Sequence, residues 1–208
     1  MVEEKINKFI SEKVPAVEAL EGRFLFIEND TLRSNISIAF QYIIFLITLD
    51  EETELQGPIT YSIYKDIIVH TATIIESCLH YCLNEYVKAG KIDSVIETKI
   101  EYKNPKQIYK IDAKNSLYLC MKGETILELK NITEFFKLNR MAKKNGILTD
   151  ELFVDADKIR EDRNKIHLSE LNSNDNYFTK NDVEETFNRA RNIIEHIEKK
   201  ISELKLLN

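Results

Sequence analysis

The sequence predicts a mainly helical protein with one small β insertion. Apolar residues recur at steps of three and four over long stretches on both sides of residues 96–130, which is the spacing of amphipathic helices. Between those stretches the pattern changes to the alternation and β-favouring residues of strands. The chain has 208 residues, of which 43% are hydrophobic and 31% charged, so it can bury a sizeable core. We therefore expect one domain over residues 1–208, built as an antiparallel helical bundle.

Two helices are predicted in the first quarter of the chain. Helical spacing indicates one at about residues 3–20, which an internal proline kinks or splits. A second at about residues 31–49 is apolar nearly all round and should be central to the fold. Its longest apolar run, YIIFLITL, has eight residues, whereas a membrane-spanning helix needs roughly 20. We expect a buried helix here and no membrane anchor.

A long helix and the β insertion follow. Gly57-Pro58 begins a helix that continues to about Lys88 and stops at Gly90. Residues 96–130 contain the segments ETKIEYK, KQIYKID, SLYLCMK and ETILELK, separated by Asn-Pro, Lys-Asn and Lys-Gly pairs. These predict three or four short strands in a meander, inserted into the helical scaffold.

Three further helices complete the predicted bundle. The first covers about residues 131–144 and ends at Asn145-Gly146. The next extends from Thr149-Asp150 to about Leu168 and is followed by an Asn-rich loop. The last covers about residues 179–206 and carries a regular apolar stripe that should face the core.

Charge is distributed unevenly along the chain. The formal net charge of −6 argues against a protein that coats nucleic acid in general, because phosphate binding depends on Lys and Arg. Residues 99–145, however, carry a local charge of +6. This basic segment either steers a polyanion toward one face or is an ordinary solvated surface rich in lysine.

The N-terminal residues indicate a cytoplasmic protein, and the cysteines indicate that it has no metal or cofactor. The first nine residues, MVEEKINKF, begin with acidic residues and are amphipathic, unlike a secretory signal, which is basic and then continuously apolar. Cys78, Cys82 and Cys120 make an odd count without a CxxC pair, which favours reduced thiols packed as small hydrophobic residues. Cys78 and Cys82 with His80 between them do not make a tetrahedral site.

The segment IREDRNKIHL, residues 159–168, contains the residues best suited to chemistry. On a continuous helix Arg160 and His167 lie about 20° apart, with Arg163 and Asn164 within about 60° of that direction. Two guanidinium groups, an amide and an imidazole would then share one narrow arc at the margin of the core. Half-buried charges of this kind are costly and are enriched at working sites.

The same residues also fit a purely structural role. Acidic residues within the segment or just before it can neutralise both arginines as surface ion pairs: Asp157, Glu161 and Asp162. Glu76 on the long helix either orients an arginine of the segment or faces solvent. A second pair, Arg191 and His196, lies about 140° apart on an unbroken helix, so we interpret it as a coincidence on the outer face of the closing helix.

The segment and its context resemble the HEPN superfamily (higher eukaryotes and prokaryotes nucleotide-binding). That family carries an arginine, commonly followed by a polar residue, and a histidine with four to six residues between them. Arg160 and His167 fit this spacing, whereas Arg163-Asn164 reproduces the arginine and polar pair but lies too close to His167. Which arginine fills the role therefore stays open. The order of helices over residues 30–90 and 131–206 is also similar, and the β insertion lies outside the resemblance.

The resemblance implies an RNA endonuclease that works without a metal. Two subunits of a homodimer would bring their motifs together, with His167 as acid or base, Arg160 and Arg163 as phosphate clamps, and Asn164 as an orienting group. Such enzymes act in toxin–antitoxin or phage-defence systems, where an antitoxin or another protein is a partner. The alternatives are a non-catalytic HEPN module for dimerisation or for binding a nucleotide or partner, and a scaffold whose β insertion recognises a protein.

Overall fold

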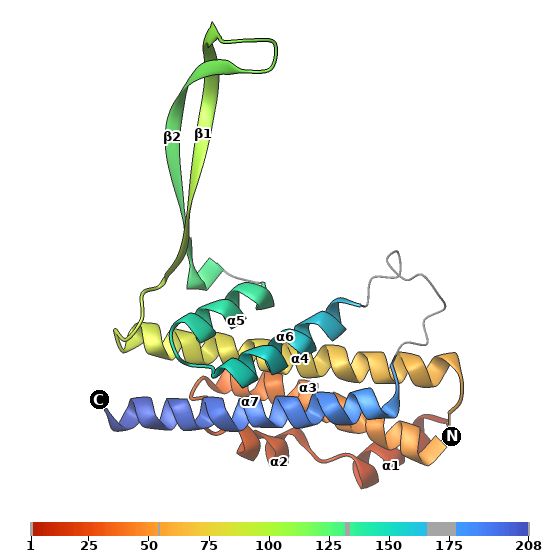
Figure 1. Cartoon of the computed structure of the whole chain (residues 1–208). Coiled ribbons are helices and arrows are strands. Elements are labelled where there is room, and N and C mark those ends of the chain that lie inside the picture. The colour runs from red at the N-terminus through yellow and green to blue at the C-terminus, as the bar shows by residue number, and fades with distance from the viewer. Residues whose placement is uncertain (1, 54, 132–133, 166–177, 208) are drawn as a thin grey trace.

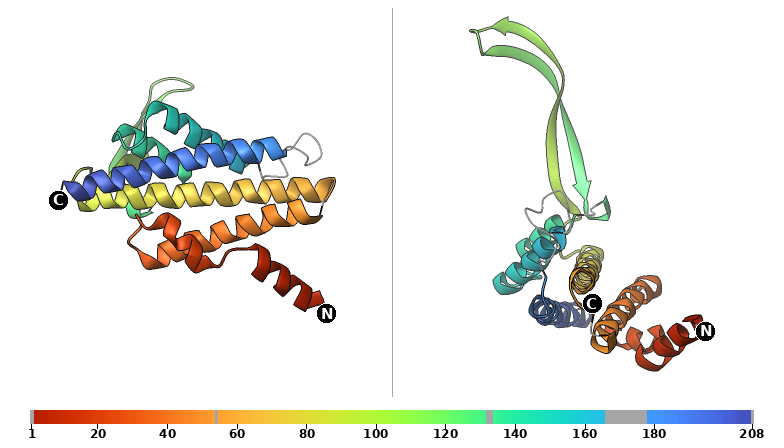
Figure 2. Two further views of the ribbon diagram at one scale, coloured as in Figure 1. Left: turned by 90° about the horizontal axis from the view of Figure 1, so that it is seen from below. Right: turned by 90° about the vertical axis from the view of Figure 1, so that its right-hand side faces the viewer.

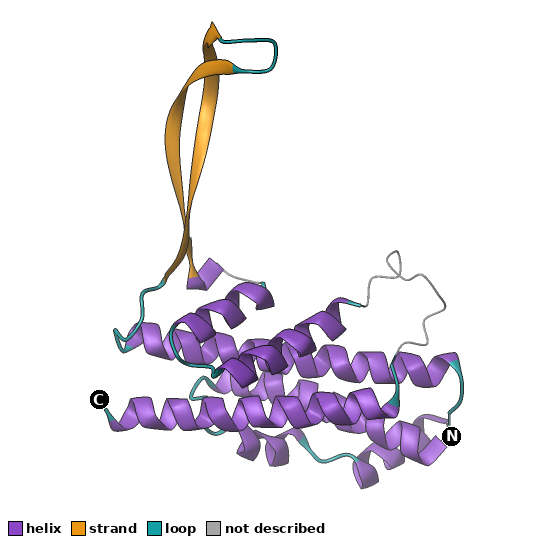
Figure 3. Cartoon of the chain, viewed as in Figure 1, coloured by secondary structure: helices purple, strands orange, loops and turns teal. Residues whose placement is uncertain are grey.

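The structure is a computed structural model that describes residues 2–53, 55–131, 134–165 and 178–207. It confirms a mainly helical fold with a small β insertion (Figures 1 and 3). The N-terminal helices and the first long helices are α1 (Val2–Lys13), α2 (Val17–Glu21), the 3-10 turn η1 (Gly22–Phe24), α3 (Asp30–Thr53) and α4 (Pro58–Lys88). The later elements are β1 (Val95–Lys110), β2 (Ser116–Glu128), the 3-10 turn η2 (Leu129–Asn131), α5 (Phe135–Lys144), α6 (Asp150–Asn164) and α7 (Lys180–Leu206).

Helix α4 is the centre of the body, with α3 and α7 along its sides and α5 and α6 packed across it (Figures 1 and 2). Twelve of its residues are buried, and they recur at the helical period that the sequence predicted. Proline at its first position has no backbone N–H to leave unsatisfied. Both α5 and α6 contact this helix, so α4 positions the side chains that they carry.

The predicted central position of α3 is wrong. Its described buried residues are few: Ile36, Ser37, Ile43 and Leu46. Helix α3 packs against α4 and against the short helix α2, and these neighbours leave Ile38 and Tyr42 exposed. Among the described residues α3 is also the helix that is long and apolar enough to cross a membrane. Length and composition alone decide that, and the core helix of a soluble protein meets the same test.

The N-terminal and C-terminal helices follow local signals. The predicted first helix is split, because Pro15 separates α1 from α2. At the start of α7, Thr179 Oγ1 accepts a hydrogen bond from the backbone of Asp182, whose side chain accepts one from the backbone of Thr179. This capping box fixes the first turn of α7, which packs along α4.

The β insertion is a single antiparallel hairpin, not the predicted meander of three or four strands. It projects from the helical body with both faces exposed (Figure 2). Asn104, with φ of 52°, lies in a shift of register between Lys103 and Lys106, so Asn104-Pro105 forms an irregularity within β1 and not a turn. The chain reverses instead after Asp112, whose Oδ1 accepts hydrogen bonds from the backbone of Lys114 and Asn115.

Candidate functional site

Helix α6 carries most of the predicted site residues. It begins at a cap in which Thr149 Oγ1 accepts a hydrogen bond from the backbone of Leu152 at 3.2 Å. It ends at Asn164, with Lys165 as its C-cap, and therefore stops earlier than the predicted Leu168. His167 lies outside the described residues. The arc that it was expected to share with the arginines therefore stays a prediction.

Buried residues fix the orientation of α6 against α4. Ala156 and Ile159 are fully buried, and Asp162 is only 7% exposed. The Asp162 carboxylate accepts hydrogen bonds from Lys158 Nζ at 3.2 Å and Lys165 Nζ at 2.6 Å. Asp162 thus pairs with lysines one turn before and one turn after it, not with Arg160 or Arg163.

Arg163 is paired with Glu76 across the interface between α6 and α4. Its Nη1 lies 2.6 Å from Glu76 Oε2, and the two side chains are 29% and 19% exposed. Burial raises the pKa of Glu76, whereas the Arg163 charge and hydrogen bond partly oppose that rise. One side of the guanidinium is therefore held in place at a position that solvent still reaches.

A polar row on α4 continues from Glu76. His80 and Asn84 follow at steps of four residues, and both are half-buried. Asn84 Nδ2 lies 3.1 Å from His80 Nδ1 and donates to the His80 carbonyl oxygen at 3.0 Å. The charge of His80 also opposes the rise in the pKa of Glu76, as that of Arg163 does, but burial remains the larger cause. His80 was not among the predicted site residues, although its spacing of four residues from Glu76 places both on one side of the helix.

Arg160 points to a different neighbour from Arg163. Its Nε donates to Asp157 Oδ1 at 2.7 Å, and its Nη2 lies 3.6 Å from Glu161 Oε1. Its Cζ lies 5.4 Å from the ring centroid of Phe136 on α5. The hydrogen bond to Asp157 is the main cause that raises the pKa of Arg160. Arg160 is thus in the surface ion-pair network that was the alternative interpretation, while Asn164 is exposed at the end of the helix.

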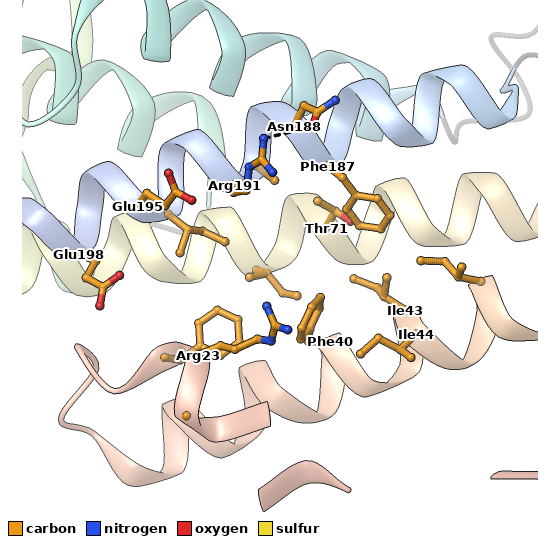
Figure 4. Close-up of a pocket in the computed structure, with 16 residues that line it drawn as sticks. Arg23, Phe40, Ile43, Ile44, Thr71, Phe187, Asn188, Arg191, Glu195 and Glu198 are labelled. Carbon is orange, nitrogen blue, oxygen red and sulfur yellow. Dashed lines mark hydrogen bonds between the residues drawn. The ribbon is translucent and has the colours of Figure 1, made fainter. Parts of the chain in front are cut away.

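The second arginine–histidine pair faces two directions, as its helical spacing predicted. His196 Nε2 lies 2.9 Å from the carbonyl oxygen of Ile147, in the connection between α5 and α6. His196 is therefore half-buried and not on an outer face. Arg191 instead lines a groove of about 600 Å³ between α3 and α7, which is otherwise largely apolar (Figure 4). The two side chains cannot act on one group.

Two of the three thiols lie in the core of the helical body. Cys78 and Cys82 are free and fully buried, and burial raises the pKa of each to about 12. Cys120 is free and half-buried on β2. Within the described ranges no group of three or more His, Cys, Asp or Glu side chains is arranged to hold a metal ion.

Comparisons of the chain with family models, with curated proteins and with solved structures give no match.

Proposed function

We propose that the protein is a metal-independent RNA endonuclease of the HEPN type that acts in the cytoplasm as a toxin or phage-defence effector. The observation that carries this proposal is the Arg163–Glu76 ion pair. It fixes a guanidinium at a partly exposed position in the last turn of α6, one helical turn before the proposed catalytic His167 in the sequence. A fixed guanidinium with free N–H groups is suited to a phosphate.

The proposed reaction needs a proton acceptor, a proton donor and a phosphate clamp. A ribose 2′-hydroxyl attacks the adjacent phosphorus, the bond to the 5′-oxygen breaks, and the products are a 2′,3′-cyclic phosphate and a 5′-hydroxyl. His167, with an imidazole that titrates near neutral pH, moves the proton to or from these oxygens. Arg163 stabilises the charge on the phosphate oxygens, and Asn164 orients the substrate. Glu76 is a positioning residue for Arg163.

We further propose that the active form is a homodimer in which two copies of the site lie together. Arg160 would then act as a second clamp only after an incoming phosphate competes with Asp157 for its guanidinium. An antitoxin that covers the site would keep the nuclease inactive in the cell. Both assignments follow from the family resemblance, and the position of Asn164 and Arg163 at the exposed end of α6 is compatible with them.

The test is RNA cleavage by the purified protein in EDTA, compared with the His167→Ala variant. We expect the wild type to cut RNA and His167→Ala to lose at least about a hundredfold in rate, the usual contribution of a general acid or base. His70→Ala is the matched control, because the His70 ring contacts Tyr42 on α3 and should leave cleavage unchanged. Equal rates for the wild type and His167→Ala would refute the assignment of His167.

A second candidate function is partner recognition by the hairpin, favoured by its exposed apolar side chains. Pairing places Leu117 opposite Tyr109 and Leu119 opposite Lys106. Directly opposed residues share a face, so this face combines apolar and basic side chains. Leu117 and Leu119 are each more than half exposed. Residues 102–122 contain five lysines and one aspartate, so an acidic protein surface is the complementary partner.

Shortening the hairpin separates the two functions. Because Glu101 pairs with Gly123, residues 102–122 can be replaced by Asn-Gly, a two-residue turn that keeps the base of the hairpin. A nuclease that needs only the helical site keeps cutting RNA after this change. A recognition module loses its partner and shows no change in any cleavage that the wild type has.

A further inference from the structure

A cleft between the base of the hairpin and α5 gathers positive charge. It has a volume of about 490 Å³, and four cationic side chains line it: Lys99, Lys137, Arg140 and Lys144. Asp93 is the acidic residue of its lining, and its Oδ1 already accepts a hydrogen bond from the backbone of Val95 at 2.9 Å. We call this the cationic cleft.

Most of the positive charge of the cationic cleft has no counterpart in the described chain. Lys137 pairs with Glu134 at 3.0 Å. For Lys99, Arg140 and Lys144 no ion pair with an acid exists among the described residues. Arg140 instead stacks over Phe136, with its Cζ 4.0 Å from the ring centroid. Cations that lie together without counterions create a positive potential in a concave surface, which attracts an anion.

Phe136 lies between the cationic cleft and α6. Its ring contacts Arg140 of the cleft at 4.0 Å and Arg160 of α6 at 5.4 Å. Phe136 and Arg140 are exposed, whereas the Arg160 side chain is 18% exposed. Positive side chains therefore follow one another from the base of β1, over α5, to α6. An extended anion can contact this series along its length, whereas a compact one fills only the cleft.

We propose that the cationic cleft binds the phosphodiester backbone of single-stranded RNA and leads the strand past Arg160 toward Arg163. Lysine offers phosphate a point charge and arginine a planar fork, and neither reads the base sequence. The cleft depends on the β insertion, which supplies Lys99 and thereby closes one of its sides. That the strand is RNA rests on the proposed nuclease function, while the binding of a phosphate backbone rests on the cleft alone.

The experiment measures binding of the full chain to a fluorescently labelled, single-stranded 2′-O-methyl oligouridylate. This probe has no free 2′-hydroxyl, so cleavage cannot interfere with the anisotropy. The test variant carries Arg140→Gln and Lys144→Gln. The control carries Lys180→Gln and Lys199→Gln, which remove the same charge from exposed positions on α7. Thermal unfolding followed by circular dichroism checks that both variants fold.

We expect the cleft variant to bind about tenfold more weakly at physiological salt and the control to bind as the wild type does. The slope of log K against log salt should become shallower by about 1.4, since each lost contact with a single strand contributes about 0.7. Equal affinity of the cleft and control variants overturns the proposal. The proposal is also overturned if uridine monophosphate displaces the probe as effectively as the unlabelled oligomer does. The site would then be a closed nucleotide site.

These results are independent of catalysis. A cleft variant that binds weakly, together with a wild type that leaves RNA intact in EDTA, supports the cationic cleft and removes the nuclease function. Unchanged binding by the cleft variant, together with cleavage by the wild type, removes the cleft and leaves the nuclease function.

Discussion

Arg163 on α6 and Glu76 on α4 form an ion pair across the helical body, with Nη1 2.6 Å from Oε2. The two residues are 87 positions apart in the sequence, so the contact depends on the tertiary fold. It joins the last turn of α6 to α4, the central helix of the body. The position of the Arg163 guanidinium, and any work that it does on a phosphate, therefore depends on Glu76.

The difference in stability between the wild type and Glu76→Gln should depend on pH. Burial raises the pKa of Glu76, so protonation of this carboxyl favours the folded state. Protonation therefore makes the wild type more stable relative to Glu76→Gln. This gain in the free energy of unfolding is fully present below the ordinary carboxyl pKa. It is lost as the pH rises through the raised value.

Urea unfolding of both proteins between about pH 4 and pH 7 measures this difference. A control substitution, Glu124→Gln on the exposed hairpin, should give no such trend. An advantage of the wild type that grows as the pH rises would contradict the cause assigned to the raised pKa.

Lysine at the two arginine positions should distinguish their roles. Arg163→Lys keeps the charge but cannot both hold Glu76 and present a fork, so we expect RNA cleavage to fall at least about tenfold. Arg160 is bound to Asp157 and Glu161, and Arg160→Lys should change the rate less than about threefold. Single-turnover cleavage rates measure both effects. A larger loss for Arg160→Lys than for Arg163→Lys would reverse the assignment of the principal clamp.

The cysteines should differ sharply in reactivity. Cys78 and Cys82 are fully buried and have a pKa of about 12, so their thiolate fraction at neutral pH is negligible. Cys120 is half-buried on the projecting hairpin. Mass spectrometry after brief treatment of the native protein with iodoacetamide should find alkylation at Cys120 alone. Rapid modification of Cys78 would show that α4 is not packed as described.

Removing the distal hairpin should not affect the stability of the helical body. The described side chains of residues 102–122 are exposed or half-buried, and none belongs to the core. Replacing them with Asn-Gly should change the midpoint of thermal unfolding by less than about 4 °C, equivalent to less than about 1 kcal/mol for a chain of this size. A larger fall would mean that the hairpin stabilises the body.

Much of the helical body follows from local sequence patterns. The stripe of α4 and the cap of α7 were predictable, because each depends on residues within a few positions of one another. The hairpin was less predictable, because Asn104-Pro105 suits a turn as well as an irregularity in a strand. The surface position of α3 depends on how many helices surround it, which periodicity does not specify.

The candidate site was predictable in its residues but not in its contacts. The sequence placed Arg160, Arg163 and three acidic residues together on α6, without indicating which acid binds which arginine. In the structure Asp162 forms ion pairs with two lysines, and Arg163 forms one with Glu76 on α4. The cationic cleft was visible only as a basic segment, because the fold alone brings Lys99 next to α5.

The chemical ends of the products test the nuclease proposal most directly. RNA incubated with the purified protein in EDTA should yield fragments with a 2′,3′-cyclic phosphate and a 5′-hydroxyl, detected by mass spectrometry. The same oligomer with 2′-deoxyribose throughout should stay intact, because it lacks the nucleophile. Intact RNA at high protein concentration, or fragments that carry a 5′-phosphate, would contradict the account.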